Sequence, residues 1–217
     1  MPPPPPRLTV LAQRAVARVL RPGDWAIDAT MGNGHDTLFL WNHVQDSGHV
    51  VAFDVQARAL YQTQQRFKDA CPSVSLVTID YHDNNVVQND NPPSGVTLIH
   101  DGHENLAQRL SASWHGQAAA IMFNLGYLPG HDDFNGDTRQ RITTRPQTTL
   151  AALHQAANLF LRPQGSSIIT VIVYPGHQGG ADEAAAVGEW VSTQLPSQFT
   201  VDRQDSRGPL LYLLQRK

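Results

Sequence analysis

The stretch that decides the fold is Asp28-Ala29-Thr30-Met31-Gly32-Asn33-Gly34, which joins an apolar run at 24–27 to a segment with helical spacing at 35–40. A glycine pair at such a junction lets backbone amides approach a ligand closely and adopt torsions that other residues resist. The stretch therefore predicts the first strand-to-helix turn of an α/β fold, with a ligand held against its backbone. A tight turn without a ligand is the alternative interpretation.

A second acidic residue follows the next apolar run of the chain. Residues 49–53 end at Asp54, about 20 residues after Gly34, which is near the ~20-residue spacing expected of an acid that holds ribose hydroxyls. An acid after a strand can instead cap the helix that follows it. Taken with the glycine turn, Asp54 favours a cofactor that contains a nucleoside.

The glycine turn departs from the dinucleotide-binding fingerprint, and the departure indicates which cofactor is bound. The third glycine of that fingerprint would fall at Thr37, and the carboxylate of Asp28 would repel a pyrophosphate. S-adenosylmethionine has no phosphate, and its sulfonium and amino groups are cationic. The turn therefore favours the methyl donor, and a nicotinamide-dependent oxidoreductase remains the alternative.

Apolar runs and helix-like segments alternate along most of the chain. This order predicts a doubly wound, mostly parallel sheet that binds its ligands at the carboxyl ends of the strands. The predicted helices are 8–20, 36–43, 56–70, 146–161 and 181–194, and the predicted strands are 24–28, 49–54, 96–100, 118–123, 165–174, 199–203 and 210–215. The segment 74–79 is either an extra edge strand or part of an elaborated loop.

Size and composition are those of an ordinary globular domain. The chain has 217 residues, of which 41% are hydrophobic and 16% charged, so we expect one domain over 1–217 with a flexible Pro-rich tail at 1–7. No apolar run approaches the ~20 residues that cross a bilayer, and no signal peptide is apparent, which predicts a cytoplasmic protein without a membrane partner. A single cysteine, Cys71, excludes an internal disulfide. The net charge of −3 leaves nucleic-acid binding open, because phosphate contacts need only local basic residues.

Polar residues after two later strands are further candidates for binding the cofactor and the acceptor. Asp101 and His103 come after the strand at 96–100, where the adenine is expected, and the spacing of this His- and acid-rich cluster matches no zinc motif, so no metal is predicted. Asn124-Leu125-Gly126-Tyr127-Leu128-Pro129 follows the strand at 118–123. A carboxamide at Asn124 is suited to aim an amine lone pair, and the ring of Tyr127 to stack on a base. The alternative for this segment is an ordinary turn.

Several segments, in this order, resemble the YtqB-like rRNA methylase family of class I methyltransferases. The resemblance implies a Rossmann-like fold whose mostly parallel seven-stranded sheet has a C-terminal antiparallel strand. It also implies S-adenosylmethionine as donor, a homodimer, and methylation of the 5-aminomethyl group of wobble (2-thio)uridine 34 in the anticodon region of tRNA. An rRNA or a small-molecule amine is the alternative acceptor. The segments are 28–37, 53–56, 101–104, 123–130, 148–149 and 174–177.

The resemblance also assigns roles to individual residues. The methionine part of the donor would lie against Asp28, Thr30, Gly32, Asn33 and Gly34, the ribose against Asp54 and Gln56, and the adenine against Asp101 and His103. Asn124 and Tyr127 would face the acceptor amine, and Asn124 would also contact the donor. The remaining candidates come from their positions in the sequence. Either His103 or His131 is a candidate to accept the proton, with solvent as the alternative. Arg139, Arg141 and Arg145 are candidates to bind phosphates, or they form a solvated basic loop, and Tyr174 and His177 are candidates to line the anticodon pocket.

Overall fold

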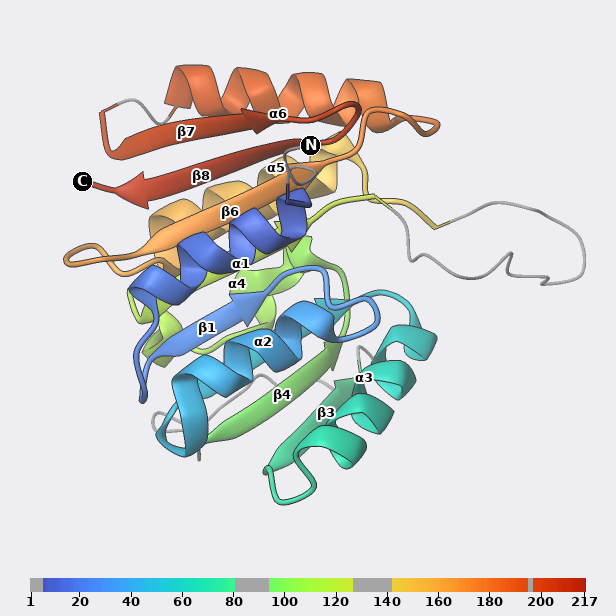
Figure 1. Ribbon diagram of the computed structural model, residues 1–217, viewed down its shortest axis with the longest axis vertical. Coiled ribbons are helices and arrows are strands. Elements are labelled where there is room, and N and C mark those ends of the chain that lie inside the picture. The colour runs from blue at the N-terminus through green and yellow to red at the C-terminus, as the bar shows by residue number, and fades with distance from the viewer. Residues whose placement is uncertain (1–5, 81–93, 127–141, 195–196) are drawn as a thin grey trace, which may run out of the picture.

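The computed structural model describes residues 6–80, 94–126, 142–194 and 197–217. One sheet crosses the whole molecule, with helices packed on both of its faces (Figure 1). The helices are α1 Leu8–Val19, α2 His35–Val44, α3 Ala57–Ala70, α4 Leu106–Arg109, α5 Pro146–Gln155 and α6 Gly180–Gln194. The strands are β1 Trp25–Asp28, β2 His49–Asp54, β3 Leu76–Asp80, β4 Gly95–His100, β5 Ala118–Asn124, β6 Ile168–Val173, β7 Phe199–Asp205 and β8 Leu210–Arg216.

The strand order of the sheet is β3-β4-β2-β1-β5-β6-β8-β7. Strand β8 is antiparallel to both of its neighbours, and the other pairs are parallel. The chain order reverses on either side of β1, so the carboxyl ends of β1, β2 and β5 meet at the point where ligands bind in such sheets. The predicted doubly wound class I fold, with its C-terminal antiparallel strand, is therefore confirmed.

The predicted count of seven strands is one short, because the segment left open between strand and loop is an edge strand. Strand β3 pairs in parallel with β4 from Leu76 to Asp80, while β4 pairs with β2. Its side chains are half-buried or exposed, in contrast with the buried strands at the centre of the sheet. The assignment of 96–100 as the third parallel strand is confirmed.

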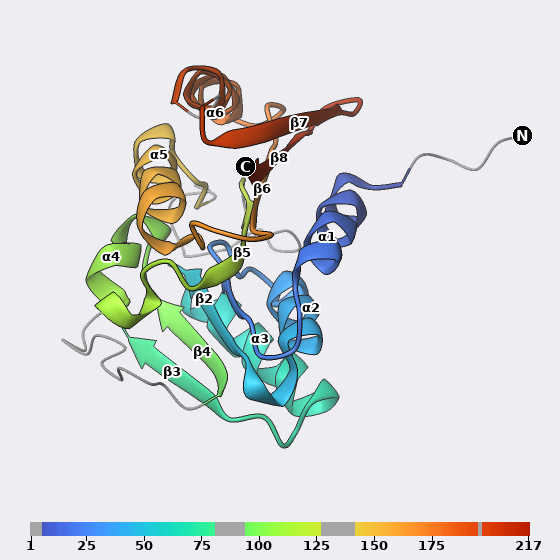
Figure 2. The same cartoon turned by 90° about the vertical axis from the view of Figure 1, so that its left-hand side faces the viewer.

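The core lies in two apolar layers, one on each face of the sheet. Every residue of β6, and every residue of β5 before Asn124, is buried, which explains their continuous apolar sequences. Helix α1 covers one face through Leu8, Ala12, Val16 and Val19, whose spacing places them on one side of the helix. Figure 2 shows α1 and α2 together on this face and α5 on the opposite one.

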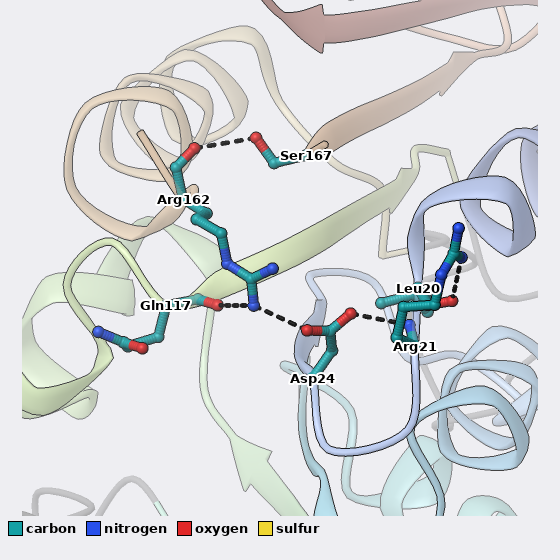
Figure 3. Close-up of polar contacts among 6 residues, drawn as sticks. All are labelled: Leu20, Arg21, Asp24, Gln117, Arg162 and Ser167. Carbon is teal, nitrogen blue, oxygen red and sulfur yellow. Dashed lines mark hydrogen bonds and ion pairs between the residues drawn. The ribbon is translucent and has the colours of Figure 1, made fainter. Parts of the chain in front are cut away.

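A polar network ties the amino ends of three central strands (Figure 3). Arg162 donates from Nη2 to the carboxylate of Asp24 at 2.8 Å and to the carbonyl of Gln117 at 3.4 Å. Ser167 donates its hydroxyl to the Arg162 carbonyl at 2.9 Å, and the backbone N–H of Arg21 is bonded to Asp24. These contacts join the starts of β1, β5 and β6 at the edge opposite the glycine turn, so they stabilise the fold away from the candidate site.

The helix predicted at 146–161 changes its hydrogen-bonding pattern near its end. Helix α5 stops at Gln155 and continues as a π-helical turn over Ala156–Phe160. A π turn shifts backbone pairing by one residue, and the Ala157 carbonyl accepts a hydrogen bond from Arg216 Nη2 at 2.6 Å. Thr144 does not cap this helix, because the N-cap position belongs to Arg145.

Within the described parts of the chain, no helix has the length and apolar character to cross a membrane.

Candidate active site

The glycine turn has the strand-turn-helix geometry that the sequence predicts. Gly32 and Gly34 have φ values of 52° and 75°, in the left-handed region that favours glycine. A Cβ on Gly34 would come within 2.5 Å of Thr63 Oγ1 in α3, so the turn is also packed too closely for a side chain. The N–H of Met31 donates to the Phe53 carbonyl at 2.8 Å, which fixes the turn beside the end of β2.

Asp54 joins the glycine turn to the N-cap residue of α3. Its Oδ2 accepts the N–H of Gly32 at 2.9 Å, and its Oδ1 accepts the N–H of Gln56 at 2.9 Å. Gln56 is the N-cap residue of α3, and the helix has no side-chain cap. The pKa of Asp54 is raised by burial, which these hydrogen bonds partly offset. The structure therefore brings Asp54 and the turn together, as a shared binding surface for a nucleoside requires.

Asp28 is a fully buried acid beneath the same turn. Thr37 donates its hydroxyl to Asp28 Oδ2 at 2.6 Å, and the N–H of Thr30 donates to Oδ1 at 3.1 Å. Burial, and then the charge of Asp36, raise the pKa of Asp28 to about 7. Thr37, the residue that breaks the dinucleotide fingerprint, is thus the one that holds the acid.

Three carboxylates with raised pKa values meet around the turn: Asp28, Asp36 and Asp54. Burial is the largest cause for each, and the charges of both Asp36 and Asp54 raise the pKa of Asp28 further. A site with this excess of buried negative charge is stabilised by a cationic ligand and repels a pyrophosphate. The residues present therefore fit the cationic amino and sulfonium groups of S-adenosylmethionine.

Asn124 joins the turn to the acceptor side of the site. Its N–H donates to Thr30 Oγ1 at 2.7 Å, and its side chain forms a hydrogen bond that lowers the pKa of Asp36. Gln13 of α1 holds the same carboxylate through a 2.7 Å bond to Oδ1. No role was predicted for Asp36 from the sequence, because an acid in the first turn of a helix also complements the helix dipole.

Tyr174 and His177 lie beside Gly126, as the sequence predicts. Gly126 belongs to the segment that follows Asn124, called here the acceptor loop. A Cβ on Gly126 would be 3.5 Å from the Tyr174 ring and 3.6 Å from His177 Nε2. Burial and the charge of Asp36 raise the pKa of Tyr174, which places the tyrosine in the same electrostatic environment as Asn124. Their role in binding an anticodon stays a prediction.

Glu183, a buried acid on α6, is linked to the acceptor loop through the hydroxyl of Thr144. Glu183 is 1% exposed and accepts hydroxyl hydrogens from Thr144 and Thr149, both at 2.7 Å. Thr144 Oγ1 in turn accepts the N–H of Gly126 at 2.9 Å. The sequence missed Glu183, since an acid near the start of a helix resembles an exposed dipole partner, and its threonine partners are more than 30 residues away in the chain.

Asp101 and His103 occupy the loop after β4. Both oxygens of Asp101 are engaged, by the Gly102 N–H, by Asn105 Nδ2 at 2.8 Å and by Arg109 Nε. His103 donates from Nδ1 to the Ala29 carbonyl at 3.1 Å, and its buried Nε2 has no partner among the residues that the structure describes. Burial lowers the pKa of His103, so the ring is neutral at pH 7 and Nε2 is an acceptor. Their contact with adenine stays a prediction.

Four predicted residues lie outside the described residues: Tyr127, His131, Arg139 and Arg141. Arg145 is described, and its side chain is exposed at the N-cap position of α5. Across the described ranges, no group of three or more His, Cys, Asp or Glu residues is placed to hold a metal.

Residues 50–207 match the family described as "Putative rRNA methylase". The chain belongs to this family. This rRNA methylase family member is an S-adenosylmethionine-dependent methyltransferase, in agreement with the cationic ligand that the three carboxylates favour. It is similar to the "tRNA (mnm(5)s(2)U34)-methyltransferase, chloroplastic" of Arabidopsis thaliana, with 32% identity over 221 residues that cover 97% of this chain and 70% of the plant protein.

Solved structures of the rRNA methylase type have the same architecture. A protein of Clostridium thermocellum described as a "putative rRNA-methylase" matches with a TM-score of 0.77 and 30% identity, over 99% of this chain and 100% of that one. A "putative methyltransferase" of Streptococcus mutans, solved in complex with SAH, matches with a TM-score of 0.72 and 27% identity, over 99% and 100% of the two chains.

Proposed function

We propose that this methyltransferase acts on tRNA and methylates the 5-aminomethyl group of wobble (2-thio)uridine 34. The observation that carries the proposal is that Asp36, beside the donor turn, interacts both with the Asn124 side chain and, through its charge, with Tyr174. This arrangement suits a primary amine presented by a flat base. The Arabidopsis relative, whose name specifies the mnm(5)s(2)U34 nucleoside of tRNA, supports the same acceptor.

The hydrogen bond between Asn124 and Asp36 determines which atom faces the acceptor. The bond lowers the pKa of Asp36, as a donor to an ionised carboxylate does. The amide nitrogen of Asn124 is therefore the donor, and its carboxamide oxygen is left to accept an N–H of the substrate amine. Gln13 holds Asp36 from the other side, which makes Asp36 a positioning residue for Asn124.

Transfer requires the amine in its neutral form, with its lone pair aligned on the methyl carbon. S-adenosylmethionine supplies an electrophilic methyl group on a sulfonium. Desolvation of the acceptor next to that cation lowers the amine pKa, so the alkylammonium loses its proton to solvent before attack. The nitrogen then bonds to the methyl carbon while the carbon–sulfur bond breaks, which leaves a secondary ammonium product and an uncharged thioether. The one proton released overall is the one that the alkylammonium loses before attack.

The proposed partner is the anticodon region of tRNA. The family resemblance adds a homodimer, and the sequence pattern adds the cytoplasm. Light scattering of the purified protein measures its oligomeric state, and a monomeric mass at micromolar concentration would reject the dimer. Cell fractionation tests the compartment.

An rRNA acceptor is the second candidate, because the family description names rRNA.

Nucleoside mass spectrometry of a deletion strain tests the proposal. Bulk tRNA from that strain should accumulate 5-aminomethyluridine or its 2-thio form, and the wild-type gene should remove it. Purified protein with donor should then methylate this tRNA but not ribosomes from the same strain. An unchanged tRNA profile, together with methylation of the ribosomes, would assign the activity to rRNA instead.

A further inference from the structure

Helix α1 carries a row of arginines on its outward face: Arg7, Arg14 and Arg18, called here the arginine row. All three side chains are exposed. Separations of seven and eleven residues place them within an arc of about 40° on a helix of 3.6 residues per turn. The helix sequence LTVLAQRAVARV contains no acid that would neutralise them.

Of the three arginines, only Arg18, in the last turn of α1, is placed to stabilise the helix through its dipole. Arg14 and Arg18 are like charges four residues apart, which repel each other on a helix surface. Arg7 occupies the N-cap position, where the helix dipole disfavours a cation, and the first turn has no acidic residue. In the described part of the chain, no ion pair joins any of the three to an acid. Among the described residues the row therefore has no acidic partner, and an anion from outside the chain can reach it.

Helix α1, which carries the arginine row, packs beside the acceptor site. Gln13, next to Arg14, reaches Asp36, whose carboxylate holds the Asn124 side chain. Figure 1 shows the start of α1 on the side of the sheet to which the β1 arrow points, and Figure 2 shows α1 beside α2. At 1.5 Å per residue the row extends about 16 Å from Arg7 to Arg18, enough to follow several phosphates of one strand.

We propose that the arginine row binds the phosphate backbone of the RNA substrate and holds it while the acceptor nucleotide occupies the site. This inference rests on the proposed function and extends it to a surface away from the acceptor loop. RNA is the partner that fits, because its phosphates form a continuous line of negative charge that arginines aligned on one helix face can contact together. A chain with a net charge of −3 can attract a polyanion only through such a local patch.

The test removes the three charges together and measures RNA binding as a function of salt. The variant Arg7→Ala/Arg14→Ala/Arg18→Ala keeps good helix formers in α1, so its circular dichroism and Tm should match those of the wild type. The control variant Lys68→Ala/Arg203→Ala/Arg207→Ala removes the same charge from exposed positions on α3, on β7 and after β7. The probe is bulk tRNA from the deletion strain, followed by fluorescence anisotropy from 50 to 300 mM salt.

We expect the row variant to bind this tRNA at least about tenfold more weakly at low salt, with a slope of log K against log salt that is shallower by about 2 units. Its affinity for S-adenosylmethionine should not change, and the KM for tRNA should rise more than kcat falls. The control variant should retain most of the wild-type affinity and slope.

Two outcomes would overturn the proposed role of the arginine row in RNA binding while leaving the proposed function intact. One is a row variant with wild-type affinity and slope, and the other is an equal loss in the control variant, which would indicate a general effect of net charge. Failure of the proposed function looks different, because the wild-type protein would then neither methylate the tRNA nor bind it in a salt-dependent manner.

Discussion

Thr144 donates its hydroxyl hydrogen to Glu183 Oε2 across 2.7 Å, and the same hydroxyl oxygen accepts the N–H of Gly126 at 2.9 Å. One threonine thus connects the loop after β5 to a carboxylate buried on α6. Thr30 holds the other side of the loop through the N–H of Asn124 at 2.7 Å. Asn124 is fixed between these two anchors, so its orientation depends on residues that lie far from it in the chain.

The substitution Thr144→Val should slow methyl transfer without weakening donor binding. Valine keeps the shape of threonine but leaves the Gly126 N–H and one Glu183 oxygen without their partner, a loss of about 1–3 kcal/mol. A loosened loop should lower kcat roughly tenfold, because small errors in alignment are costly in an in-line displacement. Single-turnover kinetics and calorimetry with S-adenosylmethionine measure the two effects separately.

Thr149→Val is the matched control for this variant. Thr149 donates to the other oxygen of Glu183 and, unlike Thr144, does not accept the N–H of Gly126. Its loss should therefore lower the stability by a similar amount while kcat changes much less. Equal losses of kcat in the two variants would show that Glu183 supports the fold as a whole and not the loop.

Replacing Asn124 with Ala should preserve donor affinity and slow transfer by about 100-fold, because the amine loses the carboxamide oxygen that aims its lone pair. Rapid-quench measurement of methylated tRNA, at saturating donor, checks the rate. Arg162→Ala serves as control, since it removes the Asp24 contact at the opposite edge of the sheet and should reduce Tm only. Normal turnover in the Asn124 variant would remove this residue from the mechanism.

The helices and strands of this fold can be predicted closely from its sequence, but the hydrogen bonds between side chains of the site cannot. Strands β5 and β6 are buried on both faces, so their apolar runs are unambiguous, whereas half-exposed β3 could not be distinguished from a loop. Asp28 and Asp54 were found because the glycine turn fixes their spacing. Asp36 and Glu183 sit near helix starts, where an acid has a common electrostatic role, and only tertiary contacts reveal what they hold.

The raised pKa of Asp28 predicts opposite effects of pH on folding and on donor binding. Its pKa is about 7 in the fold, against an ordinary value of 3.8, so between these values the folded state binds more protons than the unfolded state. Stability of the donor-free protein should therefore fall as pH rises from about 4 to about 7. Donor affinity should rise across neutral pH, because the cation prefers the ionised acid.

The variant Asp28→Asn separates these two effects. It should increase the Tm of the donor-free protein at pH 8 relative to the wild type, have little effect on Tm at pH 5, and weaken donor binding at pH 8. Differential scanning fluorimetry with and without S-adenosylmethionine measures all three, with Asp46→Asn as an exposed-acid control. If the variant has a lower Tm than the wild type by the same amount at both pH values, the hydrogen bonds of Asp28 stabilise the fold and its buried charge does not destabilise it.

Gly34→Ala should abolish donor binding and destabilise the fold, for two reasons that can be separated. Gly34 has a φ of 75°, and an added Cβ would come within 2.5 Å of Thr63 Oγ1. Gly165→Ala introduces similar torsional strain, at a φ of 80°, where no atom lies within 4 Å, so it should cost only about 1–2 kcal/mol. Urea unfolding should give a larger loss for Gly34→Ala, and Thr63→Ala in the same chain should recover part of the difference. Equal losses at the two glycines, with donor affinity retained, would mean that the close packing of the turn on α3 does not shape the donor site.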